Sequence, residues 1–364
     1  MRQFPPATGG LESVVHGLSR ALQDSGHQVN VVTLNRIFST GEKLPSYSVV
    51  NGMSVTRISH WGSRRYPIAP AVFRHVRGHD VIHIHAVDFF LDFLSLTKML
   101  HSCPIVLTTH GGIFHTKWLS ALKSAYFRTV TRQSLKRVSM VMCVSQQDYE
   151  AFSSIVPPEK LRLVPNGVEI EPYLHLQKSV SPGLLLGIGR VAENKAVDTI
   201  IHAVAQLRHQ HPAVKLTWVG PDEDSRIAKL NHLASRLGVE RQVHFRGKVS
   251  SKDLETLLTS ANLFVSSSIY EGYGLSTIEA MSSGTVPVVT RVGIHPHIIE
   301  NGKTGFLVDG DVSSFVRGLR AALELDVVTL ESMGALARRA SRQCLWEQVA
   351  RTYADAYEAV LAHA

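Results

Sequence analysis

Cysteine is scarce in this sequence of 364 residues, and its three cysteines, Cys103, Cys143 and Cys344, lie far apart. Their spacing matches no zinc site, and an odd number of distant cysteines does not make a disulfide framework. Apolar runs are also short, since none approaches the roughly 20 residues that a helix needs to span a bilayer. A signal-peptide pattern is missing as well. We therefore expect a cytoplasmic protein that is held together by hydrophobic cores.

Acidic residues are missing from one long stretch. Residues 93–147 contain no Asp or Glu, yet they hold seven Lys or Arg. The basic excess belongs to the first half of the chain: residues 1–170 hold 18 Lys and Arg against 10 Asp and Glu, whereas residues 171–364 hold 20 of each. A basic half indicates nucleic acid or an anionic membrane surface, and no nucleic-acid motif supports the first.

A helix expected over residues 117–138 arranges part of this excess on one face. Arg128, Arg132 and Lys136 recur every four residues there, so their side chains are neighbours. A solvated face usually mixes charges of both signs, and the absence of acid favours an anionic partner over that ordinary interpretation. The residues predicted to meet the membrane or acceptor are Lys117, Trp118, Lys123, Arg128, Arg132 and Lys136.

Length and patterning indicate two domains. A chain of 364 residues with 44% hydrophobic content is long enough for two cores. Strand-like runs alternate with helical stretches, which predicts parallel sheets covered on both faces. We expect two Rossmann-like, doubly wound α/β domains over residues 1–170 and 171–344, with a last helix over residues 345–364. The expected strands are 28–34, 53–58, 80–85, 104–109, 139–144 and 161–164, then 184–189, 214–219, 242–246, 262–266, 285–290 and 305–308.

The beginning of the sequence leaves little room for a first strand. Only Arg2–Phe4 is available before the helix expected over residues 11–24, whereas a strand usually has about five residues. We expect either a stunted strand or a start that lies further upstream. Gly9 and Gly10, just before the helix, are a candidate phosphate-approach loop, although such a pair is more often only a turn.

Two stretches of the second domain carry the chemistry. Glu271-Gly-Tyr-Gly-Leu-Ser-Thr-Ile-Glu279 places one carboxylate in a loop and another about two turns into the following helix, whose first backbone amides are free to bind an anion. Arg190 and Lys195 follow the strand 184–189. Cations there suit a diphosphate, because ligands of open α/β sheets bind at the carboxyl ends of strands.

Two other motifs have competing interpretations. Gly187-Ile-Gly-Arg-Val-Ala192 fits the dinucleotide pattern G-x-G-x-x-A, but residues 199–221 contain no acid to hold the ribose, so we disfavour NAD. Asp222-Glu223-Asp224 is either a metal-binding cluster or the acidic start of a helix that runs to Leu237. We favour the second, since acids complement a helix dipole.

Taken together, Arg190, Lys195, Glu271 and Glu279 resemble the motif of the retaining GT-B glycosyltransferases of family 4, over nearly the whole chain. The resemblance implies two Rossmann-like domains that face each other across a cleft, and a last helix that packs back on the first domain. It further implies that Glu279 holds the ribose hydroxyls of a nucleotide sugar, that Arg190 and Lys195 neutralise the diphosphate, and that Glu271 contacts the donor sugar. The backbone amides of Gly274 and Leu275 are implied to bind the same phosphates.

The resemblance also bears on His110, which follows the strand 104–109. A histidine at this position lines the family's cleft near the transferred sugar, so our catalytic set is Glu271, His110, Arg190 and Lys195. Gly9 and Gly10 join the donor-binding residues. The family needs no metal or other cofactor, and its leaving phosphate is thought to assist deprotonation of the acceptor. Ala196 departs from the family pattern, in which glycine often follows the lysine.

Three segments of the first domain support a narrower resemblance. Tyr66-Pro-Ile-Ala-Pro70, Asp88-Phe-Phe-Leu-Asp92 and Thr109-His-Gly-Gly-Ile-Phe-His-Thr116 are similar to those of bacterial exopolysaccharide mannosyltransferases of the xanthan and acetan type. This implies transfer of mannose from GDP-mannose to a polyprenyl-diphosphate-linked oligosaccharide, by a peripheral protein on the inner face of the plasma membrane. The alternatives are a UDP-sugar donor, a GT-B nucleotide-sugar epimerase, or a silent nucleotide-sugar binder.

Overall fold

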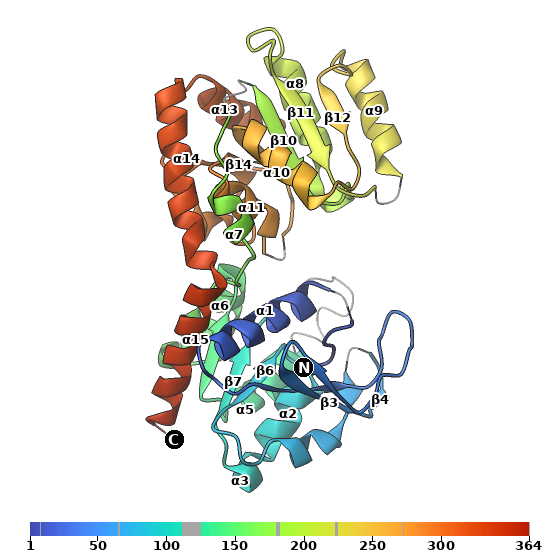
Figure 1. Ribbon diagram of the computed structural model, residues 1–364, viewed down its shortest axis with the longest axis vertical. Helices are drawn as coiled ribbons and strands as arrows, with labels where there is room; N and C mark the ends of the chain where they lie inside the picture. Colours follow the sequence, from blue (N-terminus) through green and yellow to red (C-terminus); the bar gives the residue numbers. More distant parts are fainter. Residues whose placement is uncertain are drawn as a thin grey trace. The chain divides into compact units, whose positions relative to one another are not determined.

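A computed structural model describes residues 1–7, 9–64, 66–110, 125–179, 183–222, 225–271 and 273–363. The chain divides into two compact units (Figure 1). Unit 1 comprises Met1–Gly167 with Trp346–Ala364, and unit 2 comprises Val168–Leu345. Both units are α/β with parallel sheets, as the alternating pattern predicts.

Unit 2 is built on a six-stranded parallel sheet with the order β12-β11-β10-β13-β14-β15. The chain first moves outward from β10 on one side, then returns to pair β13 with the other side of β10. This is a doubly wound topology whose direction switches between β10 and β13. The strands are β10 (Leu184–Ile188), β11 (Lys215–Val219), β12 (Val243–Phe245), β13 (Leu263–Ser266), β14 (Val286–Thr290) and β15 (Phe306–Val308).

Helices bury both faces of this sheet, which is why its strands are almost wholly apolar. Neighbouring residues alternate between two cores: Leu185 and Val288 face one, while Leu186 and Val289 face the other. The helices are α7 (Glu171–Leu174), α8 (Val197–Leu207), α9 (Arg226–Arg236), α10 (Ser251–Ser260), α11 (Leu275–Ser282), α12 (His295–Ile298), α13 (Val312–Leu323) and α14 (Val327–Ser341).

Unit 1 contains a four-stranded parallel sheet, β6-β7-β8-β9, and a three-stranded sheet, β1-β3-β2. Its parallel strands are β1 (Asn30–Leu34), β3 (Met53–Ile58), β6 (Ile82–His85), β7 (Ile105–Thr108), β8 (Met140–Cys143) and β9 (Leu161–Leu163). Its described α-helices are α1 (Gly10–Asp24), α2 (Phe89–Leu96), α3 (Lys98–His101), α5 (Arg132–Leu135), α6 (Gln146–Ser153) and α15 (Trp346–Leu361). A π-helical turn, Phe127–Thr131, leads into α5.

Unit 1 departs from the expected pattern at several places. No strand forms at Arg2–Phe4, although the Leu34 amide donates to the Arg2 carbonyl over 3.3 Å. Antiparallel strands were not expected, yet β2 (Tyr47–Val50) pairs antiparallel with β3, and β4 (Trp61–Gly62) with β5 (Pro67–Ile68). These short strands lie at edges and are partly exposed, so they lack the continuous apolar run of a central strand.

The last helix, α15, belongs to unit 1. Its residues Val349, Ala350 and Tyr353 share a core with Leu18 and Leu22 of α1. No helix among the described residues has the length and apolarity that a membrane span needs.

Candidate functional site

The carboxyl ends of β10 and β13 lie next to each other at the switch point of unit 2, and each leads into a loop that carries predicted site residues. The loop after β10 contains Arg190 and Lys195, and the loop after β13 contains Glu271. Doubly wound sheets bind their ligands at such a point. The arrangement therefore brings together residues that are far apart in the sequence.

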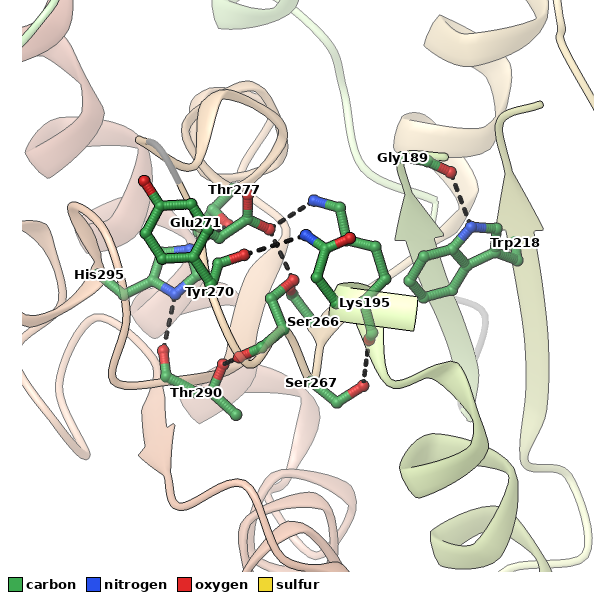
Figure 2. Close-up of polar contacts among 12 residues, drawn as sticks. Gly189, Lys195, Trp218, Ser266, Ser267, Tyr270, Glu271, Thr277, Thr290 and His295 are labelled. Carbon is green, nitrogen blue, oxygen red and sulfur yellow. Dashed lines mark hydrogen bonds and ion pairs between the residues drawn. The ribbon is translucent and has the colours of Figure 1, made fainter. Parts of the chain in front are cut away.

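A tryptophan from the neighbouring strand shapes the turn at the end of β10. The Trp218 indole Nε1 donates to the Gly189 carbonyl over 2.8 Å, and this bond is visible in Figure 2. The same ring lies across Gly187, where a Cβ would come within 2.2 Å of it. Gly187, which belongs to the dinucleotide-like pattern of the sequence, therefore leaves room for the Trp218 ring.

Lys195 and Glu271 form an ion pair, with Lys195 Nζ 2.5 Å from Glu271 Oε1. Each side chain is only 12% exposed, so water screens the pair less than it screens a surface pair. Ser268 donates its hydroxyl to the same Oε1 over 2.6 Å, and Figure 2 shows Lys195 beside the Glu271 carboxylate. The Lys195–Glu271 ion pair was not predicted from the sequence, because the family resemblance assigns the two residues to different parts of the donor.

The two loops are also tied through their backbones. The Ile269 amide donates to the Asn194 carbonyl over 2.8 Å, and Asn194 Nδ2 donates to the Tyr270 carbonyl over 3.2 Å. Ser267 donates its hydroxyl to the carbonyls of Lys195 and Ala196 over 2.9 and 2.8 Å. These bonds hold the Lys195 backbone beside the end of β13, so the ion pair does not depend on flexible side chains alone.

Helix α11 presents its amino end in the same loop region. Gly274 is its N-cap, with φ at +113°, a conformation that suits glycine. A Cβ there would also lie 2.9 Å from His295 Nε2. The amides of Leu275 and Ser276 have no acceptor among the described residues, as expected at a helix start. They remain available for an anion.

The start of α11 is connected to strand β14 through His295. The imidazole is buried, and its Nδ1 donates to the Thr290 carbonyl over 2.7 Å. Nε2 then accepts the Thr277 hydroxyl over 2.8 Å. Burial lowers the pKa of His295, which favours this neutral form. His295 thereby links the end of β14 to the first turn of α11 (Figure 2).

Glu279 is the fifth residue of α11, so it lies one turn into the helix and not two as expected. Its side chain is half-buried, and no described residue donates a hydrogen bond to its carboxylate. Burial raises the pKa of Glu279 to about 7. A half-buried carboxylate without donors is costly, and ligand hydroxyl groups would satisfy it.

The predicted residues of the first domain lie in unit 1. His110 follows β7, and its Nε2 shares a hydrogen bond of 3.1 Å with His85 Nδ1. Burial lowers the pKa of His110 to about 3, so the ring is neutral near pH 7.

Gly9 is the N-cap of α1, and a Cβ there would meet the Glu12 carboxylate at 2.2 Å. Gly10 begins the same helix and is exposed.

The predicted basic face is only partly described. Arg128, Arg132 and Lys136 are exposed, while Phe127 and Leu135 of the same segment are buried. Lys117, Trp118 and Lys123 lie outside the described residues.

Asp222 caps a helix, as favoured from the sequence. Its Oδ1 accepts the amides of Arg226 and Ile227, at the start of α9, over 2.8 and 3.2 Å. Glu223 and Asp224 lie outside the described residues.

The residues that hold the site together were not predicted from the sequence. Ser268, Asn194, Trp218 and His295 act through hydrogen bonds to neighbouring loops and strand ends. One signal was present in the sequence, since Ser266 ends β13 and Ser267 and Ser268 follow it, and hydroxyls at a strand's carboxyl end are available for loop contacts.

Comparison with known proteins assigns a family to each half of the chain. Residues 8–172 match the model described as Glycosyltransferase Family 4, and residues 176–342 match the model described as Glycosyl transferases group 1. In fold, the chain resembles HepE from Anabaena, solved with UDP, with a TM-score of 0.75 at 18% identity over 99% of this chain and 100% of that one. A glycosyltransferase from Rickettsia africae gives a TM-score of 0.74 at 16% identity, over 100% and 98% of the two chains.

Curated relatives extend the match over nearly the whole length. The chain is 34% identical to a GDP-mannose:cellobiosyl-diphosphopolyprenol alpha-mannosyltransferase from Xanthomonas campestris, over 99% of this chain and 96% of that protein. A protein of the same name from Komagataeibacter xylinus is 33% identical, over 100% of this chain and 93% of its own. The chain therefore belongs to the family 4 glycosyltransferases, which have the GT-B fold.

Proposed function

We propose that this protein transfers mannose, with retention, from GDP-mannose to an oligosaccharide linked to a polyprenyl diphosphate. The names of relatives that align over almost the whole chain support this donor and this class of acceptor. The observation that carries the proposal is the Lys195–Glu271 ion pair of 2.5 Å at the switch point of unit 2. It puts a half-buried cation where a doubly wound sheet binds its ligand.

Two cations and two backbone amides of unit 2 match the donor's diphosphate. Lys195 and Arg190 bring positive charge to the loop after β10, and the amides of Gly274 and Leu275 lie at the start of α11. Charge builds on the diphosphate as the bond to the sugar breaks, and cations held in place stabilise that charge. Because Lys195 is already held by Glu271, little reorganisation is needed when the donor binds.

The two glutamates then have different tasks. Glu279 accepts hydrogen bonds from the ribose hydroxyls, which supply the donors that its half-buried carboxylate lacks among the described residues. Glu271 contacts the hydroxyls of the transferred sugar while it keeps Lys195 in place. His110, neutral because burial lowers its pKa, serves as a hydrogen-bonding group for the sugar and not as an acid. We propose that the reaction needs no metal.

The acceptor's lipid implies a membrane surface. We propose that the protein is peripheral on the inner face of the plasma membrane, with the exposed Arg128, Arg132 and Lys136 facing anionic headgroups. Each cation near such a surface contributes about 1 kcal/mol.

The decisive experiment is a panel of labelled donors, each incubated with and without a cellobiosyl lipid diphosphate. We expect transfer of mannose from GDP-mannose to the lipid, and stronger thermal stabilisation by GDP than by UDP. Transfer from a UDP-sugar would overturn the donor assignment. Conversion of the nucleotide sugar without any acceptor would indicate an epimerase, and binding without turnover would indicate a silent binder.

A further inference from the structure

Three large apolar side chains are exposed at the corner where α2 meets α3 in unit 1. Leu96, Met99 and Leu100 are 71%, 83% and 64% exposed. Isolated exposed apolar residues need no explanation, but a cluster with a polar rim marks an interaction site. Helix α3 lies at the edge of unit 1, beyond the end of α2 (Figure 1).

Local structure forces this exposure. Helix α2 uses Phe90, Leu91 and Leu94 for the core, so Leu96 lies on its other side. Thr97 then ends the helix and donates its hydroxyl to the Phe93 carbonyl over 2.8 Å. His101, the last residue of α3, points toward the core: its ring is buried, and its Nε2 lies 3.0 Å from the Leu94 carbonyl. Met99 and Leu100 are left facing outward.

Three cationic side chains donate hydrogen bonds to backbone carbonyls at the same corner. Arg137 Nη1 donates to the Leu96 carbonyl over 3.0 Å. Lys98 Nζ donates to the Cys103 carbonyl over 2.8 Å, and Arg77 Nη2 to the Leu100 carbonyl over 3.4 Å. Such bonds also cap helix ends, which explains Lys98 and Arg137 but not the apolar side chains between them.

Acid is scarce around this corner. Residues 66–79 and 93–147 contain no Asp or Glu. Of the three acids between these stretches, Asp88 is buried and Asp92 accepts the hydroxyls of Tyr66 over 2.7 Å and Ser134 over 2.6 Å, which leaves Asp80 as the exposed one. The bond from Ser134 also joins α2 to α5, so the exposed Arg132 and Lys136 lie in and directly after the neighbouring helix.

We propose that Leu96, Met99 and Leu100 insert into the headgroup–acyl boundary of an anionic bilayer, with Arg77, Lys98 and Arg137 at the headgroup phosphates. An apolar centre with a basic rim is the composition of an interfacial membrane site. A second copy of the chain fits less well, since a symmetric contact would bring the same cations against each other. The inference rests on the proposed function, whose acceptor is a membrane lipid, and it names the side chains that enter the membrane.

An environment-sensitive probe at position 99 tests the insertion. The native cysteines Cys103, Cys143 and Cys344 are buried, so Met99→Cys can be labelled selectively with a nitrobenzoxadiazole dye in the folded protein. The matched control is Val328→Cys in unit 2, where the native side chain is 76% exposed. On vesicles of phosphatidylglycerol and phosphatidylethanolamine, we expect a blue shift and a several-fold gain in emission at position 99 only. Brominated lipids should quench that emission.

A triple variant that leaves the net charge unchanged provides a second test. Changing Leu96, Met99 and Leu100 together to Gln should lower the vesicle-bound fraction at least tenfold, whereas Val327→Gln with Val328→Gln should leave it unchanged. Hydrolysis of free GDP-mannose should be the same in both variants. Vesicle binding without a response at position 99 would overturn the insertion but leave the proposed function intact. A change of oligomeric state in the triple variant, without loss of vesicle binding, would instead assign the corner to a protein contact and overturn the proposal.

Discussion

Lys195 Nζ and Glu271 Oε1 lie 2.5 Å apart although their residues are 76 positions apart in the sequence. The pair joins the two loops at the switch point of unit 2, and Ser268 supports the same carboxylate oxygen. Each charge therefore stabilises the other, because removing either residue leaves a half-buried charge without its counterpart.

We expect Lys195→Ala to lower kcat/KM by about 100-fold, or about 3 kcal/mol of transition-state stabilisation, as for the loss of one oxyanion donor. Glu271→Ala should chiefly lower kcat. Since the residues touch, the double variant should cost at least about 1 kcal/mol less than the sum of the single changes. The control pair is Lys303 with Glu300, 2.9 Å apart but more than half exposed. Wild-type turnover in either single variant would rule out this site.

Glu279 makes donor affinity depend on pH. Burial raises the pKa of its carboxyl to about 7, whereas the ribose hydroxyls bind the ionised form and so lower that pKa on binding. The affinity for GDP-mannose should therefore rise as pH increases toward 7, by up to about tenfold per pH unit, and level off above it. Glu279→Gln should weaken binding and flatten the profile, and the exposed Glu331→Gln should do neither. Calorimetry at several pH values measures this, and an unchanged slope in Glu279→Gln would exclude the ribose assignment.

Ala196 occupies a backbone conformation that favours glycine, with φ at +44° and ψ at +43°. For an alanine this left-handed conformation costs about 1 to 2 kcal/mol, while glycine adds roughly 0.4 to 1 kcal/mol of chain entropy to the unfolded state. We expect Ala196→Gly to stabilise the protein by up to about 1.6 kcal/mol. Ala192→Gly, at an extended φ of −125°, should destabilise it. Thermal melts compare the two, and equal shifts would argue against backbone strain.

Two half-buried histidines should make unit 1 sensitive to acid. Burial lowers the pKa of His83 and of His110 to about 3. Between the unfolded value near 6.5 and these folded values, only the unfolded chain binds protons, so stability is lost as the pH falls. The slope is up to about 1.4 kcal/mol per pH unit for each residue. Urea unfolding at pH 7 and pH 5 should show a smaller loss for His83→Gln than for the exposed control His209→Gln, and equal losses would refute this account.

The basic face predicts salt-dependent membrane binding. Changing Arg128, Arg132 and Lys136 together to Gln should remove about 3 kcal/mol, and with it nearly all pelleting with anionic vesicles. High salt should release the wild-type protein, since charges are screened within about 10 Å at 0.1 M salt. A control triple in unit 2 uses the exposed residues Lys229, Arg236 and Arg241. Equal pelleting with neutral vesicles would show that these cations form an ordinary solvated face.

The sequence by itself determined the strand positions and the edge on which the site lies. Central strands are apolar runs bounded by turns, as at β14, and every expected run formed a strand. Residues that follow parallel strands meet at one edge of the sheet, so Lys195 and Glu271 were predicted to lie near a common ligand. The short strands β2, β4 and β5 were not predicted, because edge strands carry no such run.

Only the tertiary structure decided which groups touch and which stay exposed. The Lys195–Glu271 contact, the support of α11 by His295 and the raised pKa of Glu279 depend on loops that the sequence does not place relative to one another. Leu94 and Leu96 are equally apolar, yet one is buried and the other is 71% exposed. Whether a side chain is buried depends on the residues that pack around it and not on its own chemistry. The sequence alone therefore could not assign Leu94 to the core and Leu96 to the surface.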